Sequence, residues 1–330
     1  MAFVDIRFPW RYNQGSETRI MLYPWDIIGH DRELSTLEQE IAKGQLSHAY
    51  LFHGPRDTGK FSVALTLTKI LLCPNNLCNQ CADCQMVKTG SHPDLIMLRD
   101  DGGSIGIDEV RSLIRKTNLT SQGIRRIVLI EGLDRMPIEA QNSFLKTLEE
   151  PAGNTLFLMT STHIKRVLPT ILSRVRQQSF SLVDDSTMRQ KLTLRFKDCS
   201  DLEEVLEMAQ GRPGLAIRLL SEPSTLLAYK EAYNRVDQIL RNNDLVGKFA
   251  YAEYLDEDKD RLDLFFEVSN QILRKSAYDF MAQKDSLLAP RYDLEGIVHL
   301  FEHLLKTRYL IDRNANKKLA LENFFLSTEK

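Results

Sequence analysis

The most constraining feature of the sequence is a glycine-containing loop between an expected strand and an expected helix. The segment HAYLFHGPRDTGKF, residues 48–61, places Gly54, Gly59 and Lys60 in the spacing GxxxxGK, after an apolar run and before a helical pattern over 62–72. Glycines let backbone N–H groups point at phosphate, the helix N-terminus adds positive potential, and the lysine adds a mobile charge. We therefore predict a phosphate-binding loop. The alternative is a glycine turn with a surface lysine.

Short apolar runs typical of strands alternate with helical patterns through the first half of the chain. They lie at 48–54, 94–100, 126–132, 155–161 and 179–183. This alternation predicts an α/β fold, a parallel sheet wrapped by helices. Beyond residue 183 we predict short helices over 184–220 that end near Gly211, Pro213 and Gly214, and then an all-α bundle over 222–330.

Length, charge balance and the distribution of apolar residues limit the class to which the protein can belong. The chain has 330 residues, 43% of them hydrophobic, which is enough for more than one compact unit. Lys and Arg number 43 against 45 Asp and Glu, so no overall positive field draws the chain to nucleic acid. No apolar run approaches the ~18 residues of a membrane span. The N-terminus carries charges where a secretory signal would be apolar. We therefore expect a cytoplasmic protein without a membrane partner.

The groups that would hydrolyse a bound nucleotide are incomplete. Phe61 follows the loop lysine, where a Ser or Thr hydroxyl would coordinate Mg²⁺. The third apolar run ends in Glu131 and Gly132, so one carboxylate remains and the adjacent position has no side chain. Asp134 is an alternative acid, although it falls past the expected strand end. Because loss of a general base typically costs ~10²–10⁴-fold in rate, we predict binding of ATP or ADP without turnover.

Four of the five cysteines fall within one short segment, CPNNLCNQCADC, with the spacing C-x₄-C-x₂-C-x₂-C. Four thiolates can close a tetrahedral shell around Zn²⁺ and leave no position open for water, which predicts one structural zinc. The proposed ligands are Cys73, Cys78, Cys81 and Cys84. The alternatives are a redox pair, Cys81 with Cys84, or thiols that bind no metal. Cys199 is predicted to be a packed residue.

Several motifs spread over most of the chain carry a resemblance to a known family. They are HAYLFHGP at 48–55, the cysteine segment, SHPDL at 91–95, IDEVRSLIRK at 107–116, NSFLKTLEEP at 142–151 and LPTILSRV at 168–175. Together they resemble the bacterial clamp-loader AAA+ proteins, the gamma/tau and delta-prime subunits of DNA polymerase III.

The resemblance implies a domain layout. It comprises an N-terminal extension over 1–23, a RecA-like AAA+ core over 24–182 with a zinc module at 73–84, a small helical lid over 183–221 and a helical collar domain over 222–330.

Three positions distinguish branches of this family. Phe61, Gly132 after Glu131, and Gly214 stand where gamma/tau members keep a Ser or Thr, an Asp-Glu pair and a lid arginine. These differences favour the delta-prime branch, which does not hydrolyse ATP. The alternative is an active gamma/tau-type ATPase, because Lys60 and the loop glycines are kept. A third hypothesis is a zinc-containing DNA-binding or regulatory protein outside replication.

The resemblance also implies roles for individual residues. Ser173 and Arg174 match the family's SRC motif, with Val175 in place of the cysteine. The family's arginine enters the ATP site of a neighbouring subunit and stabilises charge on the γ-phosphate. An arginine that caps a helix or pairs with an acid is the alternative for Arg174. The implied nucleotide contacts are Gly54, Thr58, Gly59, Lys60, Glu131 and Thr160.

The implied partners follow from the same resemblance. They are gamma/tau-type ATPase subunits and a delta-type subunit in a hetero-pentameric ring, the sliding clamp, and primer–template DNA contacted through the assembled complex of the polymerase holoenzyme.

One further pattern bears on this assembly. The expected helix over 137–150 has an apolar face of Ala140, Phe144, Leu145 and Leu148, and a polar face of Glu139, Asn142, Lys146 and Glu149 that borders a neighbouring subunit by analogy.

Overall fold

The computed structural model describes residues 22–75, 77–100, 103–117, 125–197, 199–283, 288 and 291–329. Most of the expected N-terminal extension, residues 1–21, lies outside the described residues. The chain divides into two compact units, one running to Gly54 and resuming over Lys60–Ser181, the other combining Pro55–Gly59 with Leu182–Lys330. The expected division into core, lid and collar stays a prediction.

The first unit is built on a five-stranded sheet in the order β2-β3-β4-β1-β5. All four strand pairs are parallel. The α/β prediction is therefore confirmed. The strands are β1 (Ala49–His53), β2 (Leu95–Leu98), β3 (Arg126–Ile130), β4 (Thr155–Ser161) and β5 (Arg176–Ser179).

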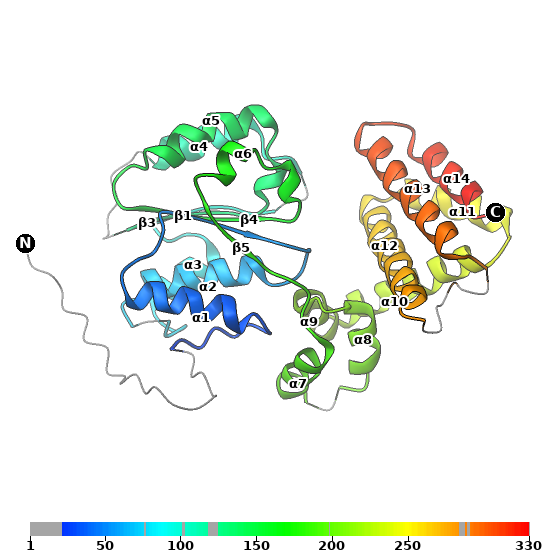
Figure 1. The fold of residues 1–330 in the computed structure, drawn as a ribbon, viewed down its shortest axis with the longest axis horizontal. Helices are drawn as coiled ribbons and strands as arrows, with labels where there is room; N and C mark the ends of the chain where they lie inside the picture. Colours follow the sequence, from blue (N-terminus) through cyan, green and yellow to red (C-terminus); the bar gives the residue numbers. More distant parts are fainter. Residues whose placement is uncertain are drawn as a thin grey trace, which may run out of the picture. The chain divides into compact units, whose positions relative to one another are not determined.

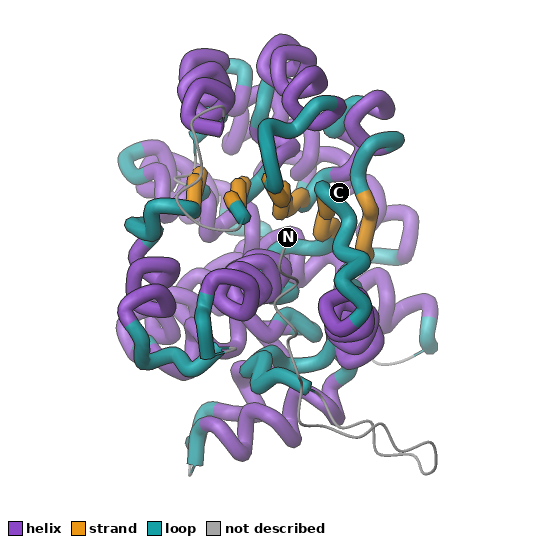
Figure 2. The backbone as a smooth tube through the Cα atoms, turned by 90° about the vertical axis from the view of Figure 1, so that its left-hand side faces the viewer, coloured by secondary structure: helices purple, strands orange, loops and turns teal. Residues whose placement is uncertain are grey.

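Helices cover both faces of this sheet, as Figures 1 and 2 show. Side chains alternate along each strand, so that Tyr50 and Phe52 of β1 enter one apolar cluster while Ala49 and Leu51 enter the other. The first cluster is closed by α1 (Asp31–Ala42), α2 (Lys60–Leu72) and α3 (Ala82–Thr89). The second is closed by α4 (Ile107–Thr117), α5 (Ile138–Glu149) and α6 (Pro169–Leu172).

Among its described residues, the second unit has helices as its only regular elements, as predicted over 184–330. Its elements are α7 (Asp185–Arg195), α8 (Leu202–Ala209), α9 (Pro213–Ser221), α10 (Pro223–Arg241), α11 (Leu245–Asp256), α12 (Lys259–Met281), α13 (Leu294–Asp312) and α14 (Lys317–Ser327). Rings of Tyr251, Phe265, Phe324 and Phe325 pack against one another among α11, α12 and α14. Among the described residues, no helix combines the length and apolarity that a membrane crossing requires.

Two expected element boundaries were wrong. The last strand covers 176–179 rather than 179–183, because β5 lies at the edge of the sheet and its mostly exposed residues are polar, whereas the apolar Phe180 packs on Phe52 from outside the strand. Pro213 and Gly214 begin α9 instead of ending a helix. Proline is tolerated there because the first helical N–H has no intrahelical acceptor.

The two expected faces of the helix α5 are confirmed. Ala140, Phe144 and Leu148 are buried and Leu145 is half-buried, whereas Glu139, Asn142, Lys146 and Glu149 are exposed. The fully buried ring of Phe144 contacts the ring of Phe157 in β4 edge-on, with 5.5 Å between the ring centroids.

We predict that Phe144→Ala lowers the free energy of unfolding of the first unit by about 3–5 kcal/mol, because it leaves a cavity between helix and sheet. Urea unfolding followed by circular dichroism measures the change. The control is Ile138→Ala on the same helix, whose side chain is 60% exposed. Equal midpoints for the two variants would contradict the packing described.

Candidate functional site

The loop over 54–59 lies between a strand, β1, and a helix, α2, as expected from the sequence. Gly54 and Gly59 have positive φ angles of 144° and 92°, and Lys60 is the first residue of α2. The Nζ of Lys60 donates to the carbonyl oxygen of Gly54 at 2.9 Å. A Cβ at Gly54 would lie 2.0 Å from the carbonyl oxygen of Phe180, so only glycine fits there. Lysine and glycine are thus fixed at the carboxyl end of β1, where parallel sheets bind ligands.

Residues Pro55–Gly59 of this loop belong to the second unit, where α9 contacts them. The backbone N–H of Gly214 donates to the carbonyl oxygen of Asp57 at 2.8 Å, and Arg218 pairs with the Asp57 carboxylate at 3.4 Å. A Cβ at Gly214 would come within 2.9 Å of that carbonyl. The place expected for a lid arginine is therefore closed to side chains. Thr58 is buried, and its hydroxyl donates to the carbonyl of Pro55.

Phe61 fills the position of the missing hydroxyl with an aromatic ring. The ring is half-buried against the apolar cluster of α1, α2 and α3, and the guanidinium carbon of Arg99 lies 5.6 Å from its centroid. A cation over an aromatic face is an attractive contact, and it brings positive charge to this end of α2. Sequence reasoning did not identify Arg99, because nothing in its local sequence distinguishes it.

The carboxylate of Glu131, directly after β3, is engaged by the protein itself. Its Oε2 accepts from the backbone N–H of Asp100 at 3.1 Å. Burial raises the pKa of Glu131, and this hydrogen bond opposes the rise. The neighbouring Asp100 pairs with Arg135 at 2.9 Å, a contact that sequence reasoning missed because the two partners lie far apart in the sequence.

The other two positions expected at this edge of the sheet are also engaged. The backbone N–H of Gly132 donates to the Thr160 hydroxyl at 3.0 Å. Asp134, the alternative acid, accepts from the backbone N–H groups of Thr162 and His163. Burial alone would raise the pKa of Asp134, but hydrogen bonds from His163, Ser161 and Thr162 outweigh it and lower the pKa to about 2. Asp134 is thus a structural carboxylate that joins two loops.

Arg174 lies just after α6, among the helices on the opposite face of the sheet from α2 (Figure 1). Its Nε donates to Glu149 Oε1 at 2.8 Å, and its Nη1 donates to the carbonyl oxygen of Thr170 at 2.7 Å. Its side chain is 36% exposed. Arg174 therefore pairs with an acid and remains at the surface.

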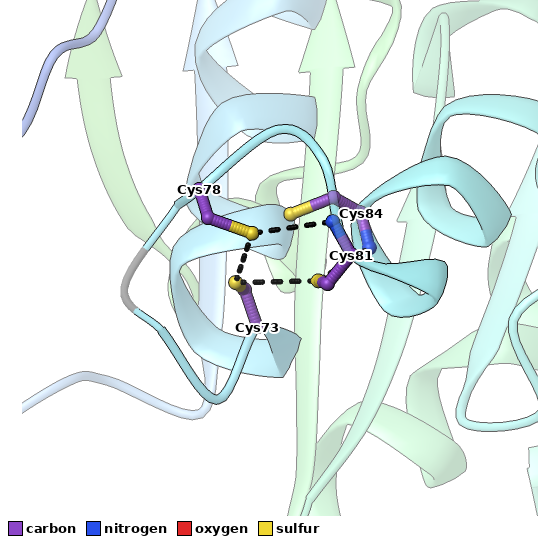
Figure 3. Close-up of side chains that lie close together, drawn as sticks. All are labelled: Cys73, Cys78, Cys81 and Cys84. Carbon is purple, nitrogen blue, oxygen red and sulfur yellow. Dashed lines mark hydrogen bonds between the residues drawn. The ribbon is translucent and has the colours of Figure 1, made fainter.

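The four clustered cysteines converge on one point (Figure 3). Cys73 follows α2, Cys81 caps α3, and all four sulfur atoms lie within 4.8 Å of one another. The Sγ of Cys73 is 3.7 Å from that of Cys78 and 3.6 Å from that of Cys81. Zn–S bonds of about 2.3 Å at tetrahedral angles place sulfurs about 3.8 Å apart, whereas a disulfide needs about 2.05 Å. The thiols therefore fit a metal shell.

Backbone N–H groups donate to two of these sulfurs. The N–H of Cys81 donates to the Sγ of Cys78 at 3.3 Å, and the N–H of Cys84 donates to the Sγ of Cys81 at 3.4 Å. Hydrogen bonds from the N–H groups of Gln80 and Cys81 lower the pKa of Cys78 to about 6. The isolated Cys199 is half-buried.

Comparison with known proteins relates most of the first unit to replication proteins. Residues 29–184 match the family model described as DNA polymerase III, delta subunit. The DNA polymerase III subunit delta′ of Pseudomonas aeruginosa is 35% identical over 207 residues, 60% of this chain and 61% of that protein. Subunit tau of Bacillus subtilis is 31% identical over 191 residues, 56% of this chain and 33% of that protein. The chain thus spans less than two thirds of each relative.

Solved structures also include chains that are similar to this one. One of them is a DNA polymerase III gamma subunit-related protein from Thermotoga maritima, 19% identical, with a TM-score of 0.48 over 89% of this chain and 97% of that one.

We predict that the purified protein carries about one equivalent of Zn²⁺, and that Cys84→Ser loses the metal because a three-sulfur shell binds it weakly. Mass spectrometry of metals measures the content, and thermal unfolding should show a lower midpoint for the variant. Cys199→Ser is the matched control and should keep both values. Metal content unchanged in Cys84→Ser would refute the assignment.

Proposed function

Because the first unit of this chain is related to the delta and delta′ subunits of DNA polymerase III, we propose that the protein is a non-hydrolysing subunit of the clamp loader. In this role it supplies Arg174 to the ATP site of a neighbouring ATPase subunit while the sliding clamp is loaded onto primed DNA. Its own loop binds ATP or ADP without turnover.

The observation that carries this proposal is the pair Phe61 and Gly132. Phe61 offers a ring in place of the hydroxyl that coordinates Mg²⁺, and Gly132 offers no acid beside Glu131. Loss of a general base costs ~10²–10⁴-fold in rate, and loss of a metal ligand adds to it. Phosphate binding needs neither group, since it relies on backbone N–H groups and on Lys60. The residues proposed to contact nucleotide are Gly54, Thr58, Gly59, Lys60, Glu131 and Thr160.

The position of Arg174 supports a role in trans. Its side chain is 36% exposed, and the residue follows α6, a helix that packs on the face of the sheet opposite α2. A planar guanidinium presents paired N–H donors that match the oxygens of a phosphate. Such an arginine typically contributes ~10³–10⁵-fold to the turnover of the site that it enters.

The proposed partners are gamma/tau-type ATPase subunits and a delta-type subunit in a five-membered ring, with the sliding clamp and primer–template DNA bound by the assembly. The C-terminal helices support packing between subunits. Large apolar side chains lie exposed on two neighbouring helices, α13 and α14, among them Val298, Leu305, Tyr309, Leu319 and Leu326. The shell of four cysteine sulfurs is proposed to hold zinc in a structural role.

We predict that the purified chain alone leaves Mg²⁺-ATP intact, because its own site lacks the groups for hydrolysis. Phosphate release is the measurement, with Lys60→Ala as the comparison that reports any turnover from this loop. Release by the isolated chain that Lys60→Ala abolishes would favour the alternative, an active gamma/tau-type ATPase.

We predict further that Arg174→Ala lowers turnover at the one neighbouring ATP site by ~10³-fold or more, so that the reconstituted complex loses that site's share of its ATPase rate. The rate is measured with the tau-type ATPase of the same organism, at saturating amounts of this chain. Arg166→Ala, which removes another exposed arginine of the same unit, is the control and should leave the rate unchanged. An unchanged rate with Arg174→Ala would remove the role in trans.

A further inference from the structure

Each nitrogen of the Arg174 guanidinium contacts a group of its own chain. Its Nε and Nη2 both contact Oε1 of Glu149, and its Nη1 donates to the carbonyl oxygen of Thr170 and to the hydroxyl of Ser173. Arginine presents donors on three nitrogens, and here every one of the three has a partner. A phosphate in a neighbouring molecule would need two adjacent donors, so part of this arrangement has to open first.

The two sides of the guanidinium differ in how readily they open. Thr170 and Ser173 belong to the same short segment as Arg174, so the Nη1 contacts move with it. Glu149 comes from a different helix, α5, and is 25 residues away in the sequence. The edge formed by Nε and Nη2 is therefore the one that an incoming anion can take over, by displacing the carboxylate.

The position of Glu149 sets the strength of this contact. Glu149 is the last residue of α5, at the negative end of the helix dipole. This end disfavours the Glu149 carboxylate and attracts the guanidinium of Arg174. Both side chains are partly exposed, 36% for Arg174 and 47% for Glu149. Ion pairs at such exposure are weak, and a phosphate carries more negative charge than a carboxylate. The ion pair with Glu149 can therefore hold Arg174 in place and still be displaced by a phosphate.

We propose that Glu149 is a latch that holds Arg174 against its own subunit until a nucleotide phosphate of the neighbouring subunit displaces it. The inference rests on the proposed function, since it adds a regulating residue to the arginine finger. Glu149 acts through Arg174 and touches no substrate, so it is a positioning residue. Without the Glu149 carboxylate, less of this chain should be needed to stimulate the neighbouring ATPase. The ATPase rate at saturating amounts of this chain should stay the same.

The first test uses the chain alone and does not depend on any partner. Phenylglyoxal modifies arginine, and the initial rate at Arg174 is followed by mass spectrometry of the peptide. Glu149→Gln keeps the shape of the side chain and removes its charge, so the rate should rise about two- to fivefold, the range expected for an exposed ion pair. Glu139→Gln, an exposed residue of the same helix, should change nothing. Equal rates in wild type and Glu149→Gln would overturn the latch.

The second test separates the latch from the proposed function. In the reconstituted ATPase assay, Glu149→Gln should lower the amount of this chain that gives half-maximal stimulation about two- to fivefold, with an unchanged plateau. A lower plateau would mean that Glu149 orients the arginine in the complex, which overturns the latch. If Arg174→Ala leaves the ATPase unchanged, the proposed function fails instead, whatever the modification rates show.

Discussion

Burial of the parallel sheet on both faces is the constraint on which the rest of this molecule depends. Alternate side chains of each inner strand enter one of two apolar clusters, so a polar group in mid-strand would lose its hydration without gaining a partner. Polar groups therefore gather where the strands end. The loop that begins at Gly54, the segment from Glu131 to Asp134 and the residues from Thr160 to His163 all lie at this carboxyl edge.

At this edge the protein's own backbone N–H groups donate to the acidic side chains. Glu131 accepts from the N–H of Asp100, and Asp134 accepts from two N–H groups of the loop after β4. These hydrogen bonds fix the orientation of both carboxylates within the fold. Lys60 is bonded to a neutral carbonyl, which a charged phosphate outcompetes. The proposed binding of phosphate without hydrolysis is compatible with these contacts.

Sequence patterns predicted the parts of the structure whose causes are local. Strands over 49–53 and 155–161 and the two faces of α5 follow from apolar spacing, and the cysteine shell follows from its spacing within one short segment. The edge strand was misplaced because β5 is polar, and its place depends on pairing with β1. The contacts of Asp100 with Arg135 and of Glu149 with Arg174 join distant residues. No local sequence pattern predicts either ion pair, so both became evident only from the structure.

The helix α2 separates the loop lysine from the cysteine cluster. It begins at Lys60, ends at Leu72 and is followed by Cys73, so the metal shell and the loop lysine lie at opposite ends. Thirteen residues at 1.5 Å each separate Lys60 from Cys73 by about 20 Å, roughly twice the distance over which charges act through physiological salt. A cation in the cysteine shell would therefore contribute little potential at Lys60. It would instead join the end of α2 to the start of α3.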